Sequence, residues 1–539
     1  MFSLTVRQGT GKIDIAASKA FPGAIRIEPD LWRLQGGAGT GMVERFIHLH
    51  GGPRLAGEAP MSLIRSLFTA KPIEASLTAS DNLRRTLGLK DLIVLGVGAV
   101  IGAGIFVITG QAAAEHAGPA LTISFVLAGL AAALAALSYA EFAAMLPVSG
   151  SAYVYAYATF GELLAWFIGW NVVAEYLLAV SSVAVGWSGY GVGLLHSMGI
   201  DVPSVLANAP LAFRDGHFVV TGAWINLPAL LVVAAITALL YTGTRQSTLF
   251  ASVVVVVKVL VVILFVVFGL QYIDTSLWHP YVPANQGGDH YGWSGVFRAA
   301  TSVFYAYIGF DAVATAAQET RNPQQNVPAG ILISLAVCTV LYIIVAAVLT
   351  GLVPFAQLAT AEPVATALAA HPQLAWLKLL TQVGAVAGLT SVILVMHLGL
   401  ARILYSMAGD GLLPRMFGAV HERFQTPHRT TVLVGLVGGV LAAVFPLSLL
   451  GDLLSMGTLL AFATVCVGVL VLRHTRPELP RGFRVPAAVV VCPLGVAVCL
   501  FLLAQMNTGN WMLLAGWTAL GMLIYVGYGY RHSLLRARD

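Results

Sequence analysis

One lysine lies in the middle of a long apolar run. Lys258 directly follows five valines and is itself followed by further valines and a leucine. It lies about 13 Å of helix from the nearer end of the run, beyond the reach of a lysine stem. A buried ammonium in such a medium costs several kcal/mol unless it is paired or loses its proton. Lys258 is therefore a candidate proton-coupling group, and the alternative is a paired lysine with a purely structural role.

A second apolar run is interrupted by four glycines within nine residues, from Gly96 to Gly104. Each costs about 1 kcal/mol relative to alanine inside a helix. Close helix packing of the small-xxx-small type accounts for a pair such as Gly98 and Gly102. The denser group Gly102-Ala103-Gly104 predicts a chain that unwinds and turns backbone N–H groups toward a ligand. A carboxylate would bind there, at the positive end of the next half-helix. The residues expected to form this site are Ile101, Gly102, Ala103, Gly104 and Ile105.

An aspartate marks a second interruption further along the chain. Asp311 follows Tyr307-Ile308-Gly309-Phe310 deep inside an apolar run. Such a residue is a functional candidate by default, although we expect Asp311 to be the N-cap of a second half-helix. The carbonyls of Ile308, Gly309 and Phe310 would then accept an ammonium group. A carboxylate site and an ammonium site on two broken helices together indicate an amino acid.

Four other side chains are candidates, each with a plainer alternative. Glu175 either receives the side chain of arginine or lysine, or holds neighbouring helices by hydrogen bonds. Thr390 and Ser391 offer hydroxyls to the Lys258 ammonium, unless they bond back to their own helix. Met396 caps a side-chain pocket, which favours small neutral substrates, or simply packs in the core. We expect Glu141 to form a gating or loop salt bridge.

Composition places these residues in a membrane protein. The chain has 539 residues, of which 58% are hydrophobic and 10% charged, against about 25% charged residues in a soluble protein. Its mean hydropathy is +0.84. A net charge of +5 does not indicate nucleic-acid binding, because the basic residues cluster in short loops between apolar runs. That distribution is the positive-inside pattern and puts both termini in the cytoplasm.

The apolar runs predict an all-α polytopic membrane protein of about twelve transmembrane helices. A phosphate-binding loop for ATP is missing, and the four cysteines lack metal-ligand spacing, so we expect neither a cofactor nor a metal. The expected helices are 91–115, 119–146, 162–194, 226–243, 247–272, 293–319, 329–353, 375–408, 430–447, 450–472, 486–506 and 510–530.

The two interrupted helices are the first and the sixth, five apart, which is typical of an inverted repeat. We therefore expect a first repeat over 91–272, a second over 293–472 and two added helices over 486–530. Residues 61–90 form a cytoplasmic segment, and 531–539 form a cytoplasmic tail. Residues 1–60 are expected to be a disordered or non-native extension, because Met61 is a plausible start and no signal-peptide core precedes it.

Several motifs resemble the amino acid–polyamine–organocation superfamily, in its cationic amino acid transporter branch. They occur in family order over residues 75–535 and comprise Gly98–Phe106, Ser138–Glu141, Pro147–Tyr153, Gly169–Asn171, Trp187–Tyr190, Tyr307–Asp311, Glu319–Gln324 and Asp410–Pro414. The resemblance implies a LeuT-type fold of five plus five helices with two more, alternating access and an amino acid substrate. In some relatives a helix-5 lysine replaces a bound sodium ion, and Lys258 matches that position.

These observations predict a secondary transporter rather than an enzyme. We expect it to take up L-amino acids with protons across a bacterial inner membrane, with membrane lipids around it. The alternatives are an uncoupled facilitator or exchanger, and a membrane sensor of amino acids. An uncoupled protein would ignore the proton gradient, and a sensor would need a cytoplasmic output domain.

Overall fold

The computed structural model describes residues 5–9, 12–16, 71, 86–146, 151–214, 216–243, 247–422, 424 and 426–535. The chain divides into two compact units, Met1–Met61 and Ser62–Asp539. In the first unit the described residues form an antiparallel hairpin of β1 (Thr5–Gly9) and β2 (Lys12–Ala16). The rest of the predicted extension 1–60, most of 61–90 and the end of the predicted tail 531–539 lie outside the described residues.

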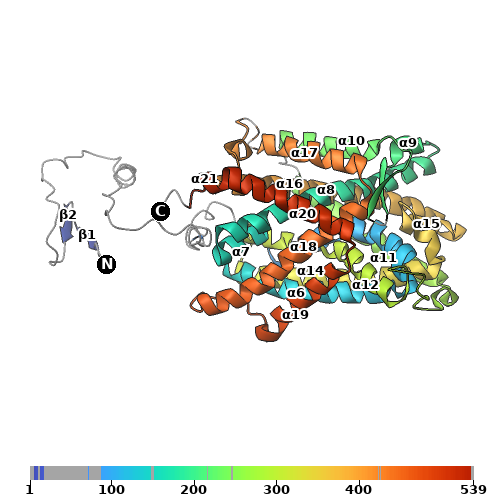
Figure 1. Cartoon of the computed structure of the whole chain (residues 1–539), viewed down its shortest axis with the longest axis horizontal. Helices are drawn as coiled ribbons and strands as arrows, with labels where there is room; N and C mark the ends of the chain where they lie inside the picture. Colours follow the sequence, from blue (N-terminus) through green and yellow to red (C-terminus); the bar gives the residue numbers. More distant parts are fainter. Residues whose placement is uncertain are drawn as a thin grey trace. The chain divides into compact units, whose positions relative to one another are not determined.

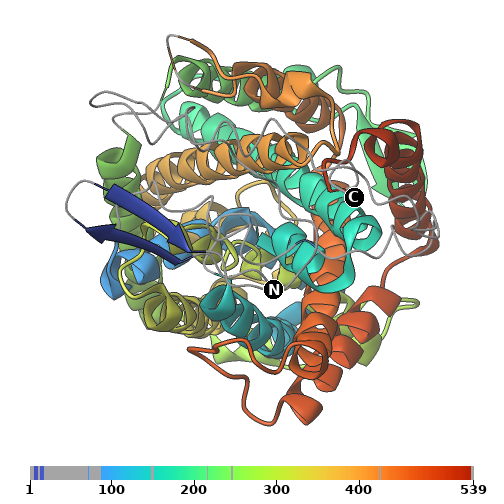
Figure 2. The same ribbon diagram turned by 90° about the vertical axis from the view of Figure 1, so that its left-hand side faces the viewer.

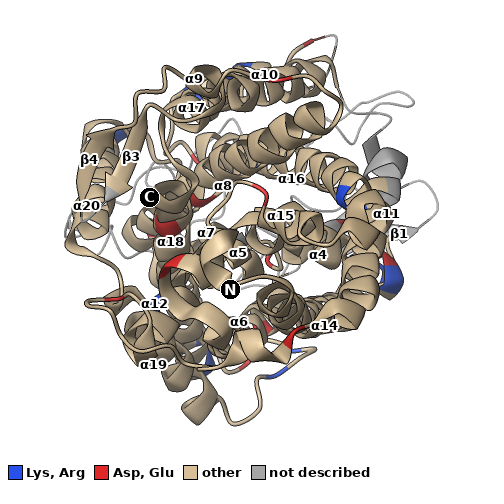
Figure 3. Cartoon of the chain, turned by 90° about the vertical axis from the view of Figure 1, so that its right-hand side faces the viewer, with Lys and Arg blue, Asp and Glu red and all other residues tan. Residues whose placement is uncertain are grey.

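The second unit is a bundle of long helices that run side by side (Figure 1) and are seen nearly end-on in Figure 2. In the described chain, seven helices are long and apolar enough to cross a membrane, and three shorter apolar helices accompany them. Charged residues are sparse on the ribbon (Figure 3). The chain is therefore a helical, multi-pass membrane protein.

The first half of the bundle contains about five of the predicted helices. Its elements are α4 (Leu89–Val100), η2 (Gly104–Ile108), α5 (Thr109–Ala112), η3 (Ala113–Ala117), η4 (Gly118–Ala120), α6 (Leu121–Met145), α7 (Ser151–Phe160), α8 (Glu162–Ser197), α9 (Ser204–Ala207), β3 (Leu211–Arg214), β4 (His217–Val220), α10 (Leu227–Thr242), α11 (Ser247–Gly269), η5 (Leu270–Tyr272) and η6 (Thr275–Trp278). The hairpin of β3 and β4 was not expected in an all-α chain, and it lies in the connection between α8 and α10.

The second half carries the remaining helices. Its elements are α12 (Gly292–Phe304), η7 (Tyr305–Tyr307), α13 (Ala312–Thr315), η8 (Ala317–Glu319), α14 (Pro323–Leu352), η9 (Phe355–Leu358), α15 (Pro363–Ala369), η10 (Pro372–Leu374), α16 (Ala375–Gly409), η11 (Arg415–Gly418), α17 (His428–Val444), α18 (Leu447–Thr475), α19 (Ala488–Ala504), α20 (Thr508–Ile524), η12 (Tyr525–Gly529) and α21 (Tyr530–His532). Pro446 separates α17 from α18, since proline has no N–H to continue the first helix.

Two of these helices are interrupted. The first broken helix, Leu89–Ala117, stops at Val100 and resumes as a π-helical turn at Gly104. The second broken helix, Gly292–Glu319, leaves helical structure after Tyr307 and resumes at Ala312. Its second half is short and consists of the single turn of α13 and the 3-10 turn η8, which ends at Glu319.

The long helix α8 occupies the centre of the bundle and packs against α16 and α18. Its mostly apolar surface is buried along much of its length, including Trp166, Tyr176 and Tyr190. The two broken helices and α11 pack beside this central group, so that side chains from five or more helices reach the level of the breaks.

A buried glutamate anchors one end of α6 to the connection between α18 and α19. Glu141 is fully buried and accepts two hydrogen bonds from Arg473, at 3.0 Å to Nε and 2.6 Å to Nη2. It also accepts the Val485 N–H at 2.7 Å, and Arg481 Nε lies 3.3 Å away. The predicted salt bridge of Glu141 is thus present as a network.

Glu141→Ala should lower the thermal stability of the bundle, because Arg481 and the Val485 N–H would lose a buried acceptor. Removing one partner of a buried pair costs on the order of 3 kcal/mol. The control is Glu478→Ala, since Glu478 and Arg476 form an exposed pair at 3.7 Å of a kind worth about 0–1 kcal/mol. Thermal melting in detergent should separate the two variants, and equal melting temperatures would contradict this role.

Candidate functional site

The two breaks face each other in the middle of the bundle. At the first, Ile101 has an extended backbone with φ −73° and ψ 98°. At the second, Ile308 is extended with φ −65° and ψ 135°, and Gly309 has a φ of 115°. A Cβ on Gly309 would lie 2.9 Å from Ala99 O in the other broken helix. Glycine is required there, because the φ is left-handed and the opposite backbone is too close.

Tyr342 on α14 joins the two breaks. Its hydroxyl lies 2.8 Å from Val100 O and 2.9 Å from Ala306 O. Both carbonyls lie in the last turn before a break, where the helical hydrogen-bond ladder ends. The hydroxyl has one proton, so it donates to one carbonyl at a time. Sequence reasoning missed Tyr342, whose only signal is a tyrosine within an apolar run.

The ammonium of Lys258 lies against the end of α4. Its Nζ donates to Gly98 O and, at 2.9 Å, to Ile101 O. The side chain is fully buried, and its stem packs on Gly388 of α16, where an added Cβ would lie 3.1 Å from the lysine Cβ. The Lys258 nitrogen therefore meets carbonyls of the first broken helix, with α11 and α16 around it.

Thr390 and Ser391 do not provide the hydroxyls expected for Lys258. Thr390 Oγ1 donates to Val386 O at 2.7 Å and accepts the Trp187 indole N–H at 2.9 Å. Ser391 Oγ donates to Gly388 O at 2.7 Å. Both hydroxyls bond back to their own helix, because the preceding turn of α16 offers carbonyls closer than the ammonium.

The predicted carboxylate site lies at the start of η2. The first N–H groups of η2 have no carbonyl of the same segment within reach. Gly102 has room for a Cβ, since the nearest atom to it would be a methyl carbon of Val392 at 3.6 Å. Gly104 instead faces Ala306, whose Cα would lie 2.4 Å from an added Cβ. Gly104 therefore lets the two broken helices touch and is a packing residue.

The second break offers fewer free acceptors than expected. Gly309 O accepts the Ala312 N–H at 3.1 Å, and Phe310 O accepts the Val313 N–H at 3.2 Å. Within the described part of the bundle, Ile308 O accepts no backbone N–H. Ile308 is therefore the carbonyl best placed to bind an ammonium group.

Asp311 occupies the N-cap position before α13, as predicted, but its side chain makes no capping hydrogen bond. The Tyr176 hydroxyl donates to Asp311 Oδ2 at 3.5 Å instead. The backbone of Asp311 is already helical, with φ −65° and ψ −23°. A capping side chain needs an extended backbone at this position, which explains the missing bond.

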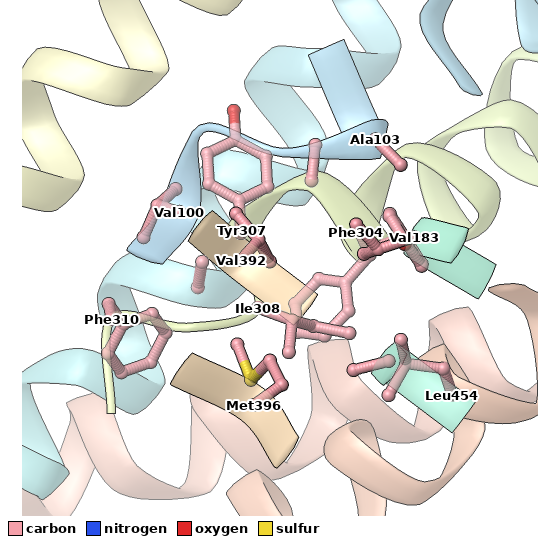
Figure 4. Packing of buried hydrophobic residues seen from close by; sticks show 14 of the residues in the cluster. Val100, Ala103, Val183, Phe304, Tyr307, Ile308, Phe310, Val392, Met396 and Leu454 are labelled. Atoms are coloured by element: carbon pink, nitrogen blue, oxygen red, sulfur yellow. The ribbon is translucent and has the colours of Figure 1, made fainter. Parts of the chain in front are cut away.

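Apolar side chains surround the breaks (Figure 4). All of them are buried, so this level of the bundle is shielded from solvent in the present conformation. They are Val100 and Ala103 of the first broken helix, Phe304, Tyr307, Ile308 and Phe310 of the second, Val183 of α8, Val392 and Met396 of α16 and Leu454 of α18. The predicted residues Ile101 and Ile105 are also buried.

Glu175 lies toward one end of this cluster. It is eight residues, or about 12 Å of helix, from Val183 on α8. Its side chain is buried and lies close enough to Asp311 for the two carboxyl groups to interact electrostatically. The neighbouring acid leaves both readings of Glu175 open, a link between helices and recognition of a side-chain charge.

Both ends of the two broken helices are joined. At one end, Glu319 O accepts the N–H groups of Thr86 and Leu87 at 2.9 and 3.0 Å. Nearby, Lys71 forms an ion pair with Asp410 at 2.7 Å, and Asp410 also accepts the Tyr153 hydroxyl at 2.8 Å. This end is called the Leu87 end. At the other end, Tyr291 N donates to His116 O at 2.9 Å, and this is called the His116 end.

The chain is similar to known membrane transporters. The family described as amino acid permease matches residues 87–527. A methylthioribose transporter of Bacillus subtilis is 44% identical over 472 residues, covering 87% of this chain and 99% of the relative. A branched-chain amino acid permease of the same organism is 44% identical over 474 residues, with the same coverage. Vacuolar cationic amino acid transporter 2 of Arabidopsis thaliana is 38% identical over 417 residues, covering 77% and 64%.

The two glycines of the first break should respond differently to a side chain. Gly102→Val should leave the melting temperature nearly unchanged but weaken ligand binding by more than about tenfold, or 1.4 kcal/mol, because the side chain fills the space beside the N–H groups. Gly104→Val should instead destabilise the bundle, because Ala306 cannot move away. Melting curves and equilibrium binding of radiolabelled leucine would measure both effects. Gly102→Val protein that binds leucine with wild-type affinity would contradict the site.

Proposed function

The chain belongs to the amino acid permease family, in the amino acid–polyamine–organocation superfamily, and from this premise we propose that it takes up L-amino acids together with protons. The family and the relatives above are transporters and not enzymes. The observation that carries the proposal is the pair of opposed helix breaks, with Lys258 donating to carbonyls of one of them.

An amino acid would bind between the breaks through its α-carboxylate and its α-ammonium group, which amino acid substrates share. Its carboxylate would accept the N–H groups from Gly102 to Ile105, at the positive end of the outer half-helix. Its ammonium would donate to Ile308 O at the second break. The two groups require donors and acceptors that face each other, and the opposed breaks at Gly102 and Ile308 support such an arrangement.

We propose a LeuT-type fold of twelve spans, in which residues 91–272 and 293–472 are the inverted repeats and 486–530 add two helices. The two breaks occur at equivalent places in the first helix of each repeat. The basic loops favour a cytoplasmic Leu87 end and cytoplasmic termini in a bacterial inner membrane. Alternating access would then open the Leu87 end and the His116 end in turn.

Lys258 is proposed to couple transport to protons. A protonated Lys258 stabilises the unwound turn, because it donates to two carbonyls whose helical partners are lost at the break. Loss of the proton leaves a neutral amine, whose two N–H groups can still reach both carbonyls but form weaker hydrogen bonds, since charge-assisted ones are roughly twice as strong. The first broken helix would then be released from α11, and one end of the bundle would open.

The apolar lining favours an apolar substrate side chain. The breaks are surrounded by Val183, Val392, Met396 and Leu454. In addition, the similarity to a branched-chain amino acid permease extends over 99% of that relative's length. Recognition of arginine or lysine would depend on Glu175, which lies toward one end of this apolar cluster and near the carboxyl group of Asp311. We therefore place leucine, isoleucine and valine first, and cationic amino acids second on account of Glu175.

Lys258→Met should abolish accumulation driven by a pH difference, while leaving exchange of substrate across the membrane measurable. Methionine keeps the apolar stem but has no donor for Gly98 O and Ile101 O. The control is Lys90→Ala, because Lys90 is an exposed lysine at the start of α4. Uptake into proteoliposomes with an imposed pH difference measures this, and concentrative uptake by Lys258→Met protein would contradict proton coupling through Lys258.

A competition panel against labelled leucine should rank the substrate side chains. Unlabelled isoleucine and valine should compete more than about tenfold better than arginine or lysine, since a buried unpaired charge costs several kcal/mol in an apolar pocket. Glu175→Gln should leave that ranking unchanged. If arginine competes as well as isoleucine and loses this ability in Glu175→Gln protein, the cationic alternative is correct.

A further inference from the structure

At the His116 end of the bundle, three potential metal ligands gather where the two broken helices meet. His116 is in η3, the last turn of the first broken helix, and Asp289 and His290 directly precede α12 of the second. One ligand atom from each of the three side chains lies within 4.8 Å of the other two. Ligand atoms around a tetrahedral Zn²⁺ are about 3.4 Å apart, given bonds of roughly 2.0–2.2 Å. A shift of about 1 Å would bring the set into coordination distance.

Backbone carbonyls orient both imidazoles for ligation. His116 Nδ1 lies 3.2 Å from Asp289 O, and His290 Nδ1 lies 2.9 Å from Glu115 O. A carbonyl oxygen only accepts, so each Nδ1 carries the proton and each Nε2 keeps its lone pair in the neutral ring. A histidine that binds a metal typically donates its other N–H to such a carbonyl. The two rings are also nearly parallel, at 26°, with centroids 6.0 Å apart.

The guanidinium group of Arg298 would repel a bound metal ion, but it lies closer to Asp452 than to Asp289. Arg298 Nε lies 3.5 Å from Asp289 Oδ2, whereas its Nη2 lies 2.5 Å from Asp452 Oδ2. Asp452 also accepts the Asn510 amide at 2.9 Å, which fixes that pair inside the bundle. Asp289 Oδ2 also lies 3.8 Å from His116 Nδ1, and the Asp289 side chain is 48% exposed, so metal binding requires its carboxylate to turn toward the Nε2 atoms while Arg298 stays with Asp452.

From this geometry we propose that His116, Asp289 and His290 form a binding site for a divalent transition metal of the Zn²⁺ class. Two imidazoles and one carboxylate suit Zn²⁺, whereas Mg²⁺ and Ca²⁺ prefer oxygen ligands only. Three protein ligands leave a position for water, consistent with the exposure of His290. The site does not depend on the transport function proposed above.

A bound metal would fasten the two broken helices to each other at this end. They are already joined there, because Tyr291 N donates to His116 O at 2.9 Å and the Tyr291 hydroxyl donates to Ala114 O at 2.5 Å. The metal adds side-chain bonds across the same junction. Any motion that separates η3 from the start of α12 would then have to break metal–ligand bonds.

The test is a titration of the full chain in detergent, without a polyhistidine tag, in which Zn²⁺ is shared with a chromophoric chelator. Wild-type protein should show a saturable site that His290→Ala lacks and that Asp289→Asn weakens by more than about tenfold. His290 is exposed, so its replacement should leave the melting temperature unchanged.

The matched control is His196→Ala. His196 is an exposed histidine paired with Asp201 at 2.6 Å, and the described residues supply no second histidine to that pair. This variant should retain the wild-type site, and Zn²⁺ should raise the melting temperature of wild-type and His196→Ala protein but not of His290→Ala protein. Identical titrations of wild-type, His290→Ala and Asp289→Asn protein would overturn the proposal.

Discussion

A helix that stops inside an apolar bundle leaves backbone groups that must find new partners. No water reaches the middle of a membrane, so each unpaired N–H or C=O there costs several kcal/mol. In this chain Lys258 donates hydrogen bonds to Gly98 O and Ile101 O, and the Tyr342 hydroxyl donates to Val100 O or Ala306 O. The proposed site uses the N–H groups from Gly102 to Ile105 and the carbonyl of Ile308, which are backbone groups at the breaks that Lys258 and Tyr342 do not bind.

The same pairing makes the two broken helices one structural unit. They are joined at the Leu87 end through Glu319 O, in the middle through Tyr342 and the contact of Gly104 with Ala306, and at the His116 end through Tyr291. Lys258 ties this unit to α11 by its hydrogen bonds to Gly98 O and Ile101 O. In the proposed mechanism, a change of protonation at this one nitrogen would alter how the unit is held.

Much of this arrangement can be predicted from sequence. Apolar runs of membrane length locate the helices, and Gly102-Ala103-Gly104 and Gly309-Phe310-Asp311 locate the breaks, because these residue types are costly in a continuous helix. The position of Lys258 within its run places it beyond the reach of water. Membership in the amino acid–polyamine–organocation superfamily was predicted from motif order and is confirmed by the family match.

The partners of individual groups could not be predicted, since they depend on helix rotation and on distances of a few ångströms. Gly104 was expected to leave room for the ligand's carboxylate, yet its missing side chain makes room for Ala306. Thr390 and Ser391 were assigned to Lys258, yet they bond to their own helix. Tyr342 and Gly309 illustrate the reason. Tyr342 binds the carbonyl of Val100 and Gly309 packs against Ala99, both in another helix far away in the sequence, and no local sequence pattern marks such a contact.

A structure determined with leucine bound would test the proposed site most directly. The leucine carboxylate should lie within hydrogen-bond distance of the N–H groups from Gly102 to Ile105, and its ammonium should contact Ile308 O. Its side chain should point toward Val183, Met396 and Leu454. Leucine found elsewhere in the bundle, or between the two breaks with its carboxylate turned away from those N–H groups, would contradict the role of the broken helices.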